Sequence, residues 1–451
     1  MSSAVTMLGL CVGATVLSPR ELQLGVPLAR GNFGSVRWAR QGSQLCVAKS
    51  ASVLDSAAME RAVEYLEVEA DINRLLAERM PHEYLDQRSV PPYLGRVAVD
   101  GEKHLIFEAC GSHTLDTFLQ RGDAGRRDLC AALGLPQPDP AADSDGGGEL
   151  SRRVLHDTLS CLAFVHARGV VHRDVKPENL LVDTEHCCLR LLDFGSACDA
   201  AGWVRQRGYH PDRVPCSILY VPPEEALDLR SPYTFDVYSA ALVYLSVAVP
   251  VLGTSESALY ELRLQLRDYR HDPVAWRESA ERAAAIGGAE GQGPGSGGGD
   301  GIGGGDGSGG GDRIGGGGGG SSDSSGGATL PAGWEAAFGT SGRSGGETPR
   351  DRPGDRAWEL LTQLIALDPA QRPTAAEALL SPFLNADCST NEVAMPAREP
   401  WSVEATLEAA IKAVNEALGG GRGKRNQQLD RRVLEADECA LPYPAEDGEV
   451  G

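Results

Sequence analysis

The stretch from Val171 to Leu181 constrains the fold of this chain more than any other. It places Asp174, Lys176 and Asn179 at a fixed spacing between apolar residues that are typical of the ends of buried strands. An ordinary charged turn before a hairpin is the alternative, but so many ordered positions are hard to attribute to chance. The sequence therefore predicts a polar loop held between two buried strands.

This order resembles the catalytic loop of eukaryotic-type protein kinases, H-R-D-L-x-x-x-N. The resemblance implies an α+β fold of two lobes, with a small β-rich lobe over a larger, mainly helical lobe. It also implies that Asp174 accepts the proton of a substrate hydroxyl, that Lys176 steadies the γ-phosphate of ATP and that Asn179 binds Mg²⁺. A lysine two residues after the aspartate is typical of serine/threonine kinases rather than tyrosine kinases.

A glycine-containing turn lies near the start of the chain. Residues Leu28 to Val36 are predicted to form a strand, a tight turn and a second strand, and they resemble the glycine-rich loop of kinases. Gly31 and Gly34 stand where the backbone must approach the nucleotide phosphates without a side chain, whereas Ala29 departs from the pattern. A plain hairpin turn is the alternative. The resemblance assigns Leu28, Gly31, Gly34 and Val36 to the nucleotide site.

The next apolar strand ends in Lys49, at the place of the kinase lysine that contacts the α- and β-phosphates. Apolar residues at helical spacing then predict a helix over 57–79. Among its acids we assign Glu69 as the partner of Lys49, because the apolar residues after it match the family's spacing. Glu64 and Glu67 are the rivals, and a merely solvated acidic face is the simplest alternative.

A strand and a hinge are predicted over Lys103 to Gly111. By order along the chain, Phe107 would lie beside the adenine, and the backbone from Glu108 to Cys110 would bind its edge. Leu181, at the end of the polar loop, is assigned to the same nucleotide site. Any apolar strand that ends in a glycine fits this pattern, so the assignment depends on the order of the motifs.

Four residues further along complete the resemblance. Asp193, in the D-F-G element, would be the second Mg²⁺ ligand. Glu224 stands at the glutamate of A-P-E, although Pro222 replaces the alanine, and its buried carboxylate would need Arg372 as partner. Asp236 matches the helical aspartate that braces the catalytic loop.

Charge and hydropathy restrict the partners of this chain. Its 451 residues carry a formal net charge of −21, which disfavours nucleic acid as a partner because phosphate backbones require a basic surface. No run of about 20 apolar residues is present, so no membrane-spanning helix is predicted in this chain. The resemblance implies ATP and Mg²⁺ as cofactors and proteins as substrates, and we expect a monomer.

Composition also divides the chain. A glycine- and serine-rich stretch cannot build a core and is expected to form a disordered insertion in the second lobe. A helical apolar stripe with a serine cap predicts one amphipathic helix in the tail. The predicted parts are an N-terminal segment, 1–21; a kinase domain, 22–384, with lobes 22–110 and 111–384; the insertion, about 287–346; and a tail, 385–451, with a helix at about 402–418.

Residues 236–277 narrow the resemblance further. The segments 235–252, 262–269 and 272–277 are similar to those of the chloroplast thylakoid state-transition kinases. This similarity implies threonine phosphorylation of antenna or photosystem II proteins and peripheral association with the stromal face of the thylakoid. The state-transition member of that family carries a membrane span and a cysteine pair before the domain, whereas only Cys11 precedes it here. A cytosolic kinase unrelated to plastids, or a catalytically inactive pseudokinase that serves as a binding module, are the alternatives.

Overall fold

The structure is a computed structural model of the whole chain. It describes residues 22–30, 34–52, 56–78, 89–137, 148–200, 217–228, 230–290, 328–338 and 353–385. The N-terminal segment 1–21, Gly31 and the helix expected at about 402–418 lie outside the described residues. Within the described part of the chain, no helix combines the length and apolarity needed to cross a bilayer.

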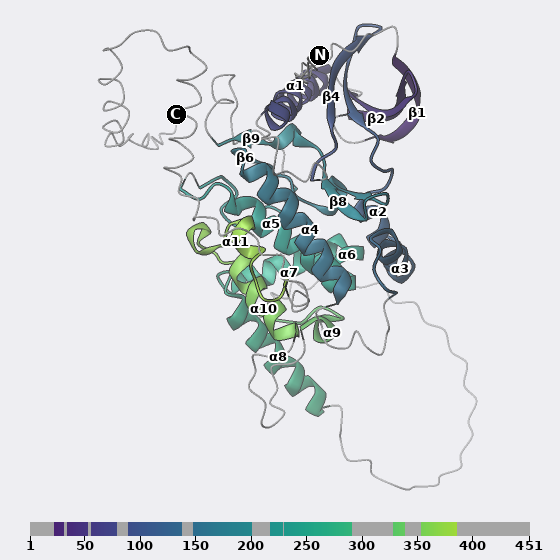
Figure 1. Ribbon diagram of the computed structural model, residues 1–451. Coiled ribbons are helices and arrows are strands. Elements are labelled where there is room, and N and C mark those ends of the chain that lie inside the picture. Colours follow the sequence, from purple (N-terminus) through teal and green to yellow (C-terminus); the bar gives the residue numbers. More distant parts are fainter. Residues whose placement is uncertain are drawn as a thin grey trace, which may run out of the picture. The chain divides into compact units, whose positions relative to one another are not determined.

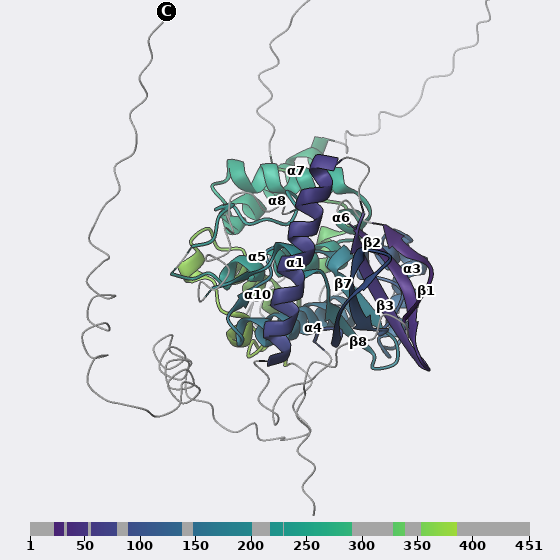
Figure 2. The same cartoon turned by 90° about the horizontal axis from the view of Figure 1, so that it is seen from above.

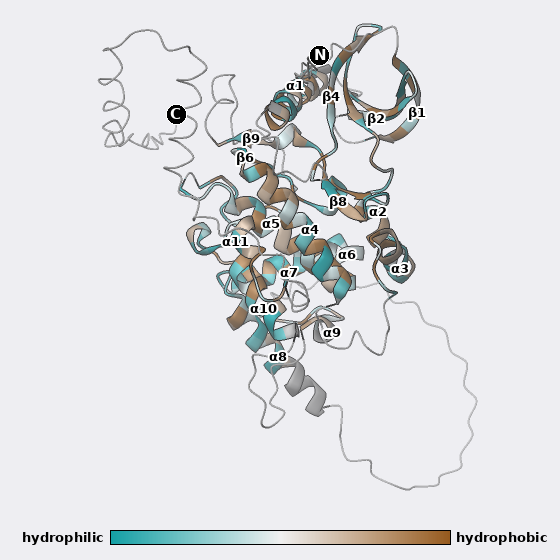
Figure 3. Cartoon of the chain, in the orientation of Figure 1, coloured by the Kyte–Doolittle hydropathy of each residue, from teal (hydrophilic) through white to brown (hydrophobic). Residues whose placement is uncertain are grey.

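The small lobe is built on a five-stranded antiparallel sheet in the order β1-β2-β3-β5-β4 (Figure 1). Its strands carry both hydrophilic and hydrophobic residues (Figure 3). Successive side chains of a strand point to opposite faces, so Cys46 and Ala48 are buried on one face while Lys49 points to the other. The strands are β1 Leu22–Arg30, β2 Gly34–Gln41, β3 Gln44–Ala51, β4 Tyr93–Val99 and β5 Glu102–Glu108.

Helix α1, Ser56–Glu78, covers one side of this sheet (Figure 2). Its buried residues Ala62, Leu66 and Ala70 recur at helical spacing and pack with Leu105 of β5. This packing fixes the rotation of the helix, and with it the direction in which the acidic residues between these positions point.

The large lobe surrounds one apolar helix, α5, Thr234–Ala248. Almost every residue of α5 is buried, as expected for a helix that is hydrophobic on all sides, and Asp236 is its one charged residue. Helix α4, Glu149–His166, packs directly against it. The other helices are α2 Leu115–Leu119, α3 Gly122–Ala132, α6 Pro250–Thr254, α7 Glu256–Asp268, α8 Pro273–Glu290, α9 Trp334–Phe338, α10 Pro353–Leu364 and α11 Ala375–Ala378, with a 3-10 turn η6 at Pro369–Gln371. The predicted two-lobed fold is confirmed.

The insertion expected at about 287–346 includes residues that the structure describes. Residues 328–338 lie inside that range, yet Trp334–Phe338 form α9, and Ala328, Trp334 and Phe338 enter the core. Trp334 is 2% exposed, and its ring lies 4.9 Å from that of Trp276 and 5.8 Å from that of Trp358. A single tryptophan contributes a large buried apolar area. Composition averaged over a glycine-rich window does not show such a residue, so it could not predict that this part of the range enters the core.

The segment that returns from the glycine-rich stretch is also held by polar contacts. The side chain of Gln265 accepts hydrogen bonds from Trp276 Nε1 and from the backbone N–H of Thr329, both at 3.0 Å, and donates to Thr329 Oγ1 at 3.0 Å. Helix α7 therefore anchors residue 329 directly.

Replacing residues 291–327 by a Gly-Ser linker of about twelve residues is expected to change the free energy of unfolding by less than about 1 kcal/mol. Loop-closure entropy changes by only about 0.6 kcal/mol for each doubling of loop length. Urea unfolding of the two chains measures the difference. A loss above about 2 kcal/mol would mean that residues 291–327 pack against the domain.

Candidate active site

Lys49 lies between two carboxylates. Its Nζ is 2.7 Å from Glu69 Oε2 of α1 and 2.8 Å from Asp193 Oδ1. Of the three candidate acids on α1, the structure brings Glu69 to Lys49, whereas Glu67 pairs with Arg96 and Lys103 and Glu64 is exposed. The packing of α1 on the sheet sets this choice, because it turns Glu69 inward.

The surroundings shift the pKa values of Lys49, Glu69 and Asp193 differently. Burial works against the charged form of Lys49, but Asp193 and Glu69 together raise its pKa. Burial raises the pKa of Glu69 to about 7 despite the charge of Lys49. Burial also opposes ionisation of Asp193, yet Lys49 lowers its pKa to about 2. Asp193 is therefore anionic at neutral pH, and its side chain, 45% exposed, is the most accessible of the three.

Asp174 and its neighbours form a second group. Asp174 Oδ2 lies 2.8 Å from Lys176 Nζ and accepts a hydrogen bond of 3.0 Å from Asn179 Nδ2, which also donates to the Asp174 carbonyl at 2.8 Å. The other carboxylate oxygen, Oδ1, accepts from the backbone N–H of Ser217 at 3.0 Å. The structure thus brings together Asp174, Lys176 and Asn179, the three residues assigned to the polar loop.

Two short two-stranded sheets hold the groups together. Strand β7, Leu180–Asp183, pairs with β8, Cys188–Leu191, and β6, Val170–Val171, pairs with β9, Cys198–Asp199. The backbone N–H of Leu192 donates to the carbonyl of Asn179 at 2.8 Å, so Asn179 and Asp193 lie at the same end of the β7–β8 hairpin. They belong to two 3-10 turns, η2 Pro177–Asn179 and η3 Phe194–Ser196 with its N-cap Asp193.

The donor set at this hairpin end suits Mg²⁺. A carboxylate and an amide oxygen are the hard ligands that Mg²⁺ takes, usually with water and phosphate oxygens. The Asn179 amide nitrogen is bonded to Asp174, which leaves the amide oxygen for a metal. In the parts of the chain that the structure describes, no group of three or more His, Cys, Asp or Glu residues could hold a metal by itself, so further ligands would have to come from a bound phosphate or water.

Asp236 braces the polar loop from below. Its carboxylate, fully buried, accepts hydrogen bonds from the backbone N–H groups of His172 and Arg173, both at 2.7 Å, and from His166 Nε2 at 2.8 Å. Arg173 has φ of 70°, a left-handed conformation that costs free energy for a residue other than glycine. The paired N–H bonds to Asp236 hold that conformation.

The Asp236→Asn variant is expected to lose about 2–3 kcal/mol of stability. The N–H groups of His172 and Arg173 bond to different carboxylate oxygens, and in asparagine an NH2 donor would replace one of these acceptors. Burial opposes ionisation, but the hydrogen bond and charge of His166 lower the pKa of Asp236. Its share of stability is therefore complete above the ordinary value near 4 and lost as pH falls through the lowered one.

Urea midpoints of Asp236→Asn and wild type should differ equally at pH 6 and pH 8 and converge below about pH 4. Asp268→Asn, at an exposed site on α7, is the control and should leave the midpoint unchanged. An Asp236→Asn midpoint equal to that of wild type would contradict the bracing role.

The residues assigned to the nucleotide are placed as follows. Leu28 and Val36 are half-buried and Leu181 is 8% exposed. A Cβ on Gly34 would lie 2.8 Å from the carbonyl oxygen of Ser50, so only glycine fits there. Gly31 lies outside the described residues.

The hinge has one backbone group of Glu108 engaged within the protein. The N–H of Glu108 donates to the carbonyl of Pro92 at 2.9 Å, so Glu108 has its carbonyl to offer to an adenine. The Cys110 thiol donates weakly to that carbonyl at 3.6 Å, and burial raises the pKa of Cys110 to about 11. A ligand that bonds the Glu108 carbonyl would displace this thiol contact.

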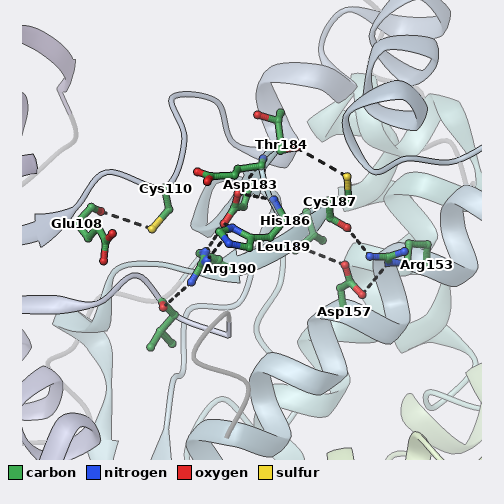
Figure 4. A network of polar contacts seen from close by, with 12 residues as sticks. Glu108, Cys110, Arg153, Asp157, Asp183, Thr184, His186, Cys187, Leu189 and Arg190 are labelled. Carbon is green, nitrogen blue, oxygen red and sulfur yellow. Dashed lines mark hydrogen bonds and ion pairs between the residues drawn. The ribbon is translucent and has the colours of Figure 1, made fainter. Parts of the chain in front are cut away.

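Sequence reasoning missed a polar network behind the hinge (Figure 4). Arg190 of β8 donates to Asp183 at 2.6 Å and to the carbonyl of Val90 at 3.2 Å, and so joins the β7–β8 hairpin to the segment before β4. Asp157 of α4 accepts from the N–H of Leu189 at 3.2 Å. The sequence signal for this network was Arg190, a charged residue in the otherwise apolar strand β8. A buried arginine requires polar partners, so its position predicts a polar network.

A model of the protein kinase domain matches residues 22–384. Among relatives from Arabidopsis thaliana, serine/threonine-protein kinase STN8, chloroplastic, is 35% identical over 147 residues, which cover 28% of this chain and 29% of that protein. Serine/threonine-protein kinase STN7, chloroplastic, is 24% identical over 288 residues, or 59% of this chain and 49% of that protein. The chain therefore spans less than half the length of these two curated relatives.

A solved structure shares the fold. The crystal structure of a Stt7 homolog from Micromonas algae soaked with ATP superimposes with a TM-score of 0.56 at 20% sequence identity, covering 84% of this chain and 96% of that one. At this identity the likeness concerns the fold alone.

Proposed function

Because this chain belongs to the protein kinase domain family, we propose that it is an ATP-dependent serine/threonine protein kinase. The observation that carries the proposal is the placement of Lys49 between Glu69 and Asp193, at 2.7 and 2.8 Å. A lysine held between carboxylates is oriented for a phosphate, and a kinase uses such a lysine on the α- and β-phosphates of ATP.

The two groups divide the chemistry between them. Bound Mg²⁺, held by Asp193 and Asn179, would neutralise the phosphate charge. Asp174 orients the substrate hydroxyl and accepts its proton, and Lys176, 2.8 Å away, offsets the charge on the transferred phosphate. Leu28, Val36, Leu181 and the backbone of Glu108 and Cys110 would enclose the adenine. Catalysis is then mainly positioning and charge stabilisation.

The test is transfer of radiolabelled γ-phosphate from ATP to casein by the full chain and by Asp174→Asn. Loss of a positioned base lowers rates by about 10²- to 10⁴-fold, and Asn keeps the size of the side chain. Equal transfer by both chains, or none by either, would instead favour a pseudokinase that binds partners. Ala29 and Pro222, which depart from the kinase motifs, support this alternative.

We also propose that the substrates are photosynthetic antenna or photosystem II proteins phosphorylated on threonine, in the chloroplast at the stromal face of the thylakoid. The support is the likeness to two kinases named chloroplastic and the segments 235–252, 262–269 and 272–277. Imaging of a tagged full-length protein tests the location, and a cytoplasmic signal would favour a cytosolic kinase.

A further inference from the structure

A row of polar side chains crosses the sheet of the small lobe on the face opposite Lys49. Residues that stand directly opposite each other on paired strands share a face of the sheet. The register pairs Arg30 of β1 with Ser35 of β2, and Ser35 with Ser50 of β3. Ser50 in turn pairs with His104 of β5. Lys49 precedes Ser50 in β3 and points to the other face, so the sheet separates this row from the proposed nucleotide site.

The polar groups of this row are incompletely bonded. His104 is 2% exposed, and neither of its ring nitrogens has a hydrogen-bond partner among the described residues. Glu102 Oε2 lies 3.8 Å from His104 Nε2, too far for a hydrogen bond. The hydroxyl oxygens of Ser35 and Ser50 are 3.2 Å apart and either can donate to the other, so one hydroxyl hydrogen of the pair remains to be donated elsewhere. A ligand that supplies acceptor atoms would satisfy these donors.

The same face of the sheet forms a pocket of about 660 Å³ that is lined by two arginines. Neither Arg30 nor Arg37 forms an ion pair within the part of the chain that the structure describes. Glu102 also lines the pocket, and its side chain is 54% exposed. Burial lowers the pKa of His104, Glu102 opposes that shift and Arg37 adds to it. The imidazole is therefore neutral at neutral pH, and the two guanidinium groups outnumber the carboxylate.

This donor set matches a phosphate monoester. A dianion pairs with two guanidinium groups, whose planar forks suit the oxygens of a phosphate, and its remaining oxygens accept from the free serine hydroxyl and the neighbouring imidazole N–H. The pocket volume is in the range of sites for whole organic ligands, about 300–1,000 Å³, so the phosphate belongs to a larger molecule. The described lining has no aromatic side chain on which a nucleotide base could stack.

The position of the pocket favours a protein segment as the ligand. Strand β1 lies at the edge of the five-stranded sheet, and residues 27–30 of this strand line the pocket. An edge strand presents backbone N–H and C=O groups that no other strand of its sheet pairs, and an extended peptide binds to such an edge by the hydrogen bonds of a further strand. A segment that lay along β1 would bring its own side chains to the pocket.

We propose that this pocket binds the phosphorylated side chain of a protein segment that lies along the edge of β1. Arg30 and Arg37 pair with the phosphate, and the row formed by Ser35, Ser50 and His104 supplies neutral donors. None of these side chains belongs to the proposed catalytic groups, so the inference does not depend on kinase activity.

The test is fluorescence anisotropy of a labelled, valine-rich peptide with one phosphoserine, titrated with the full chain. Wild type should bind this peptide at least about tenfold more tightly than the same peptide with serine. Arg37→Gln should weaken binding by about tenfold or more, because charge-assisted hydrogen bonds to the phosphate are lost. Arg37→Lys keeps the charge without the planar fork and should recover part of the affinity.

Two further variants separate recognition from folding. Arg30→Gln changes an exposed side chain and should also weaken phosphopeptide binding by about tenfold. Arg40→Gln, exposed on the same strand as Arg37 but on the opposite face, is the matched control and should bind as wild type. All three Gln variants should unfold at the urea concentration of wild type, since none of these arginines has a described ion-pair partner to lose.

A saturating non-hydrolysable ATP analogue with Mg²⁺ should leave the phosphopeptide affinity unchanged, because the sheet lies between the two sites. Displacement by the analogue, equal affinity for the two peptides, or wild-type affinity in Arg37→Gln would overturn the inference. Tighter binding of inorganic phosphate, or of vesicles that contain a phosphoinositide, than of the phosphopeptide would refute a protein segment as the ligand. A chain that binds the phosphopeptide but transfers no label to casein would refute the proposed kinase activity and leave this site supported.

Discussion

Replacing Lys49 by methionine is expected to lower kcat/KM for phosphate transfer by about 10²- to 10³-fold, the usual effect of removing one preorganised donor from developing charge. The structure explains why no neighbour can substitute. The Lys49 ammonium lies within 2.8 Å of both Glu69 and Asp193, and without it these carboxylates face each other. Asp193, the proposed Mg²⁺ ligand, would then lose the cation that holds its side chain in place. Initial rates at varied ATP concentration measure the effect.

A second lysine that pairs with a glutamate of α1 provides a matched control. Lys103 pairs with Glu67 of α1 at 2.6 Å, but that lysine side chain is 58% exposed. Exposed ion pairs contribute about 0–1 kcal/mol, so Lys103→Met should keep kcat/KM within about twofold. Comparable losses in the two variants would show that an ion pair on α1 matters for folding rather than for the nucleotide.

The spacing of motifs anticipated most of the site. Asp174, Lys176 and Asn179 fall within one short loop, so the sequence nearly determines their separation. Lys49 and Glu69 are twenty residues apart, yet a strand and a helix of regular geometry connect them, and the pairing could be predicted from the apolar residues that fix the helix rotation. The sequence could not show that Lys49 also contacts Asp193, because no local geometry links them.

Other features depended on contacts that composition hides. The core position of Trp334 depends on Trp276 and Trp358, which come from two other helices. A window dominated by glycine gives no hint of such partners. Arg190 and Val90, whose carbonyl accepts a hydrogen bond from the arginine, are similarly far apart in the sequence. The sequence of β8 contains an arginine but does not indicate its partner.

Arg372→Met is expected to lower the free energy of unfolding by about 3–5 kcal/mol, because it leaves a partly buried carboxylate without its cation. The side chain of Arg372 is completely buried and donates to both oxygens of Glu224, at 2.7 and 2.8 Å. It also donates to the carbonyls of Ala366 and Leu367 at 2.7 and 3.2 Å. One side chain thus ties Glu224, at the end of the segment that begins with Ser217, to the start of η6.

A double-mutant cycle separates the pair from the carbonyl contacts. If the unpaired charge of Glu224 dominates, Arg372→Met combined with Glu224→Gln should be more stable than Arg372→Met alone, with a coupling energy of about 1–3 kcal/mol. If the carbonyl bonds dominate, the second substitution should add to the loss. Urea unfolding of the four chains distinguishes the two cases. Additive losses would refute the ion pair as the main link, since charges in contact at 2.7 Å in a buried site cannot act independently.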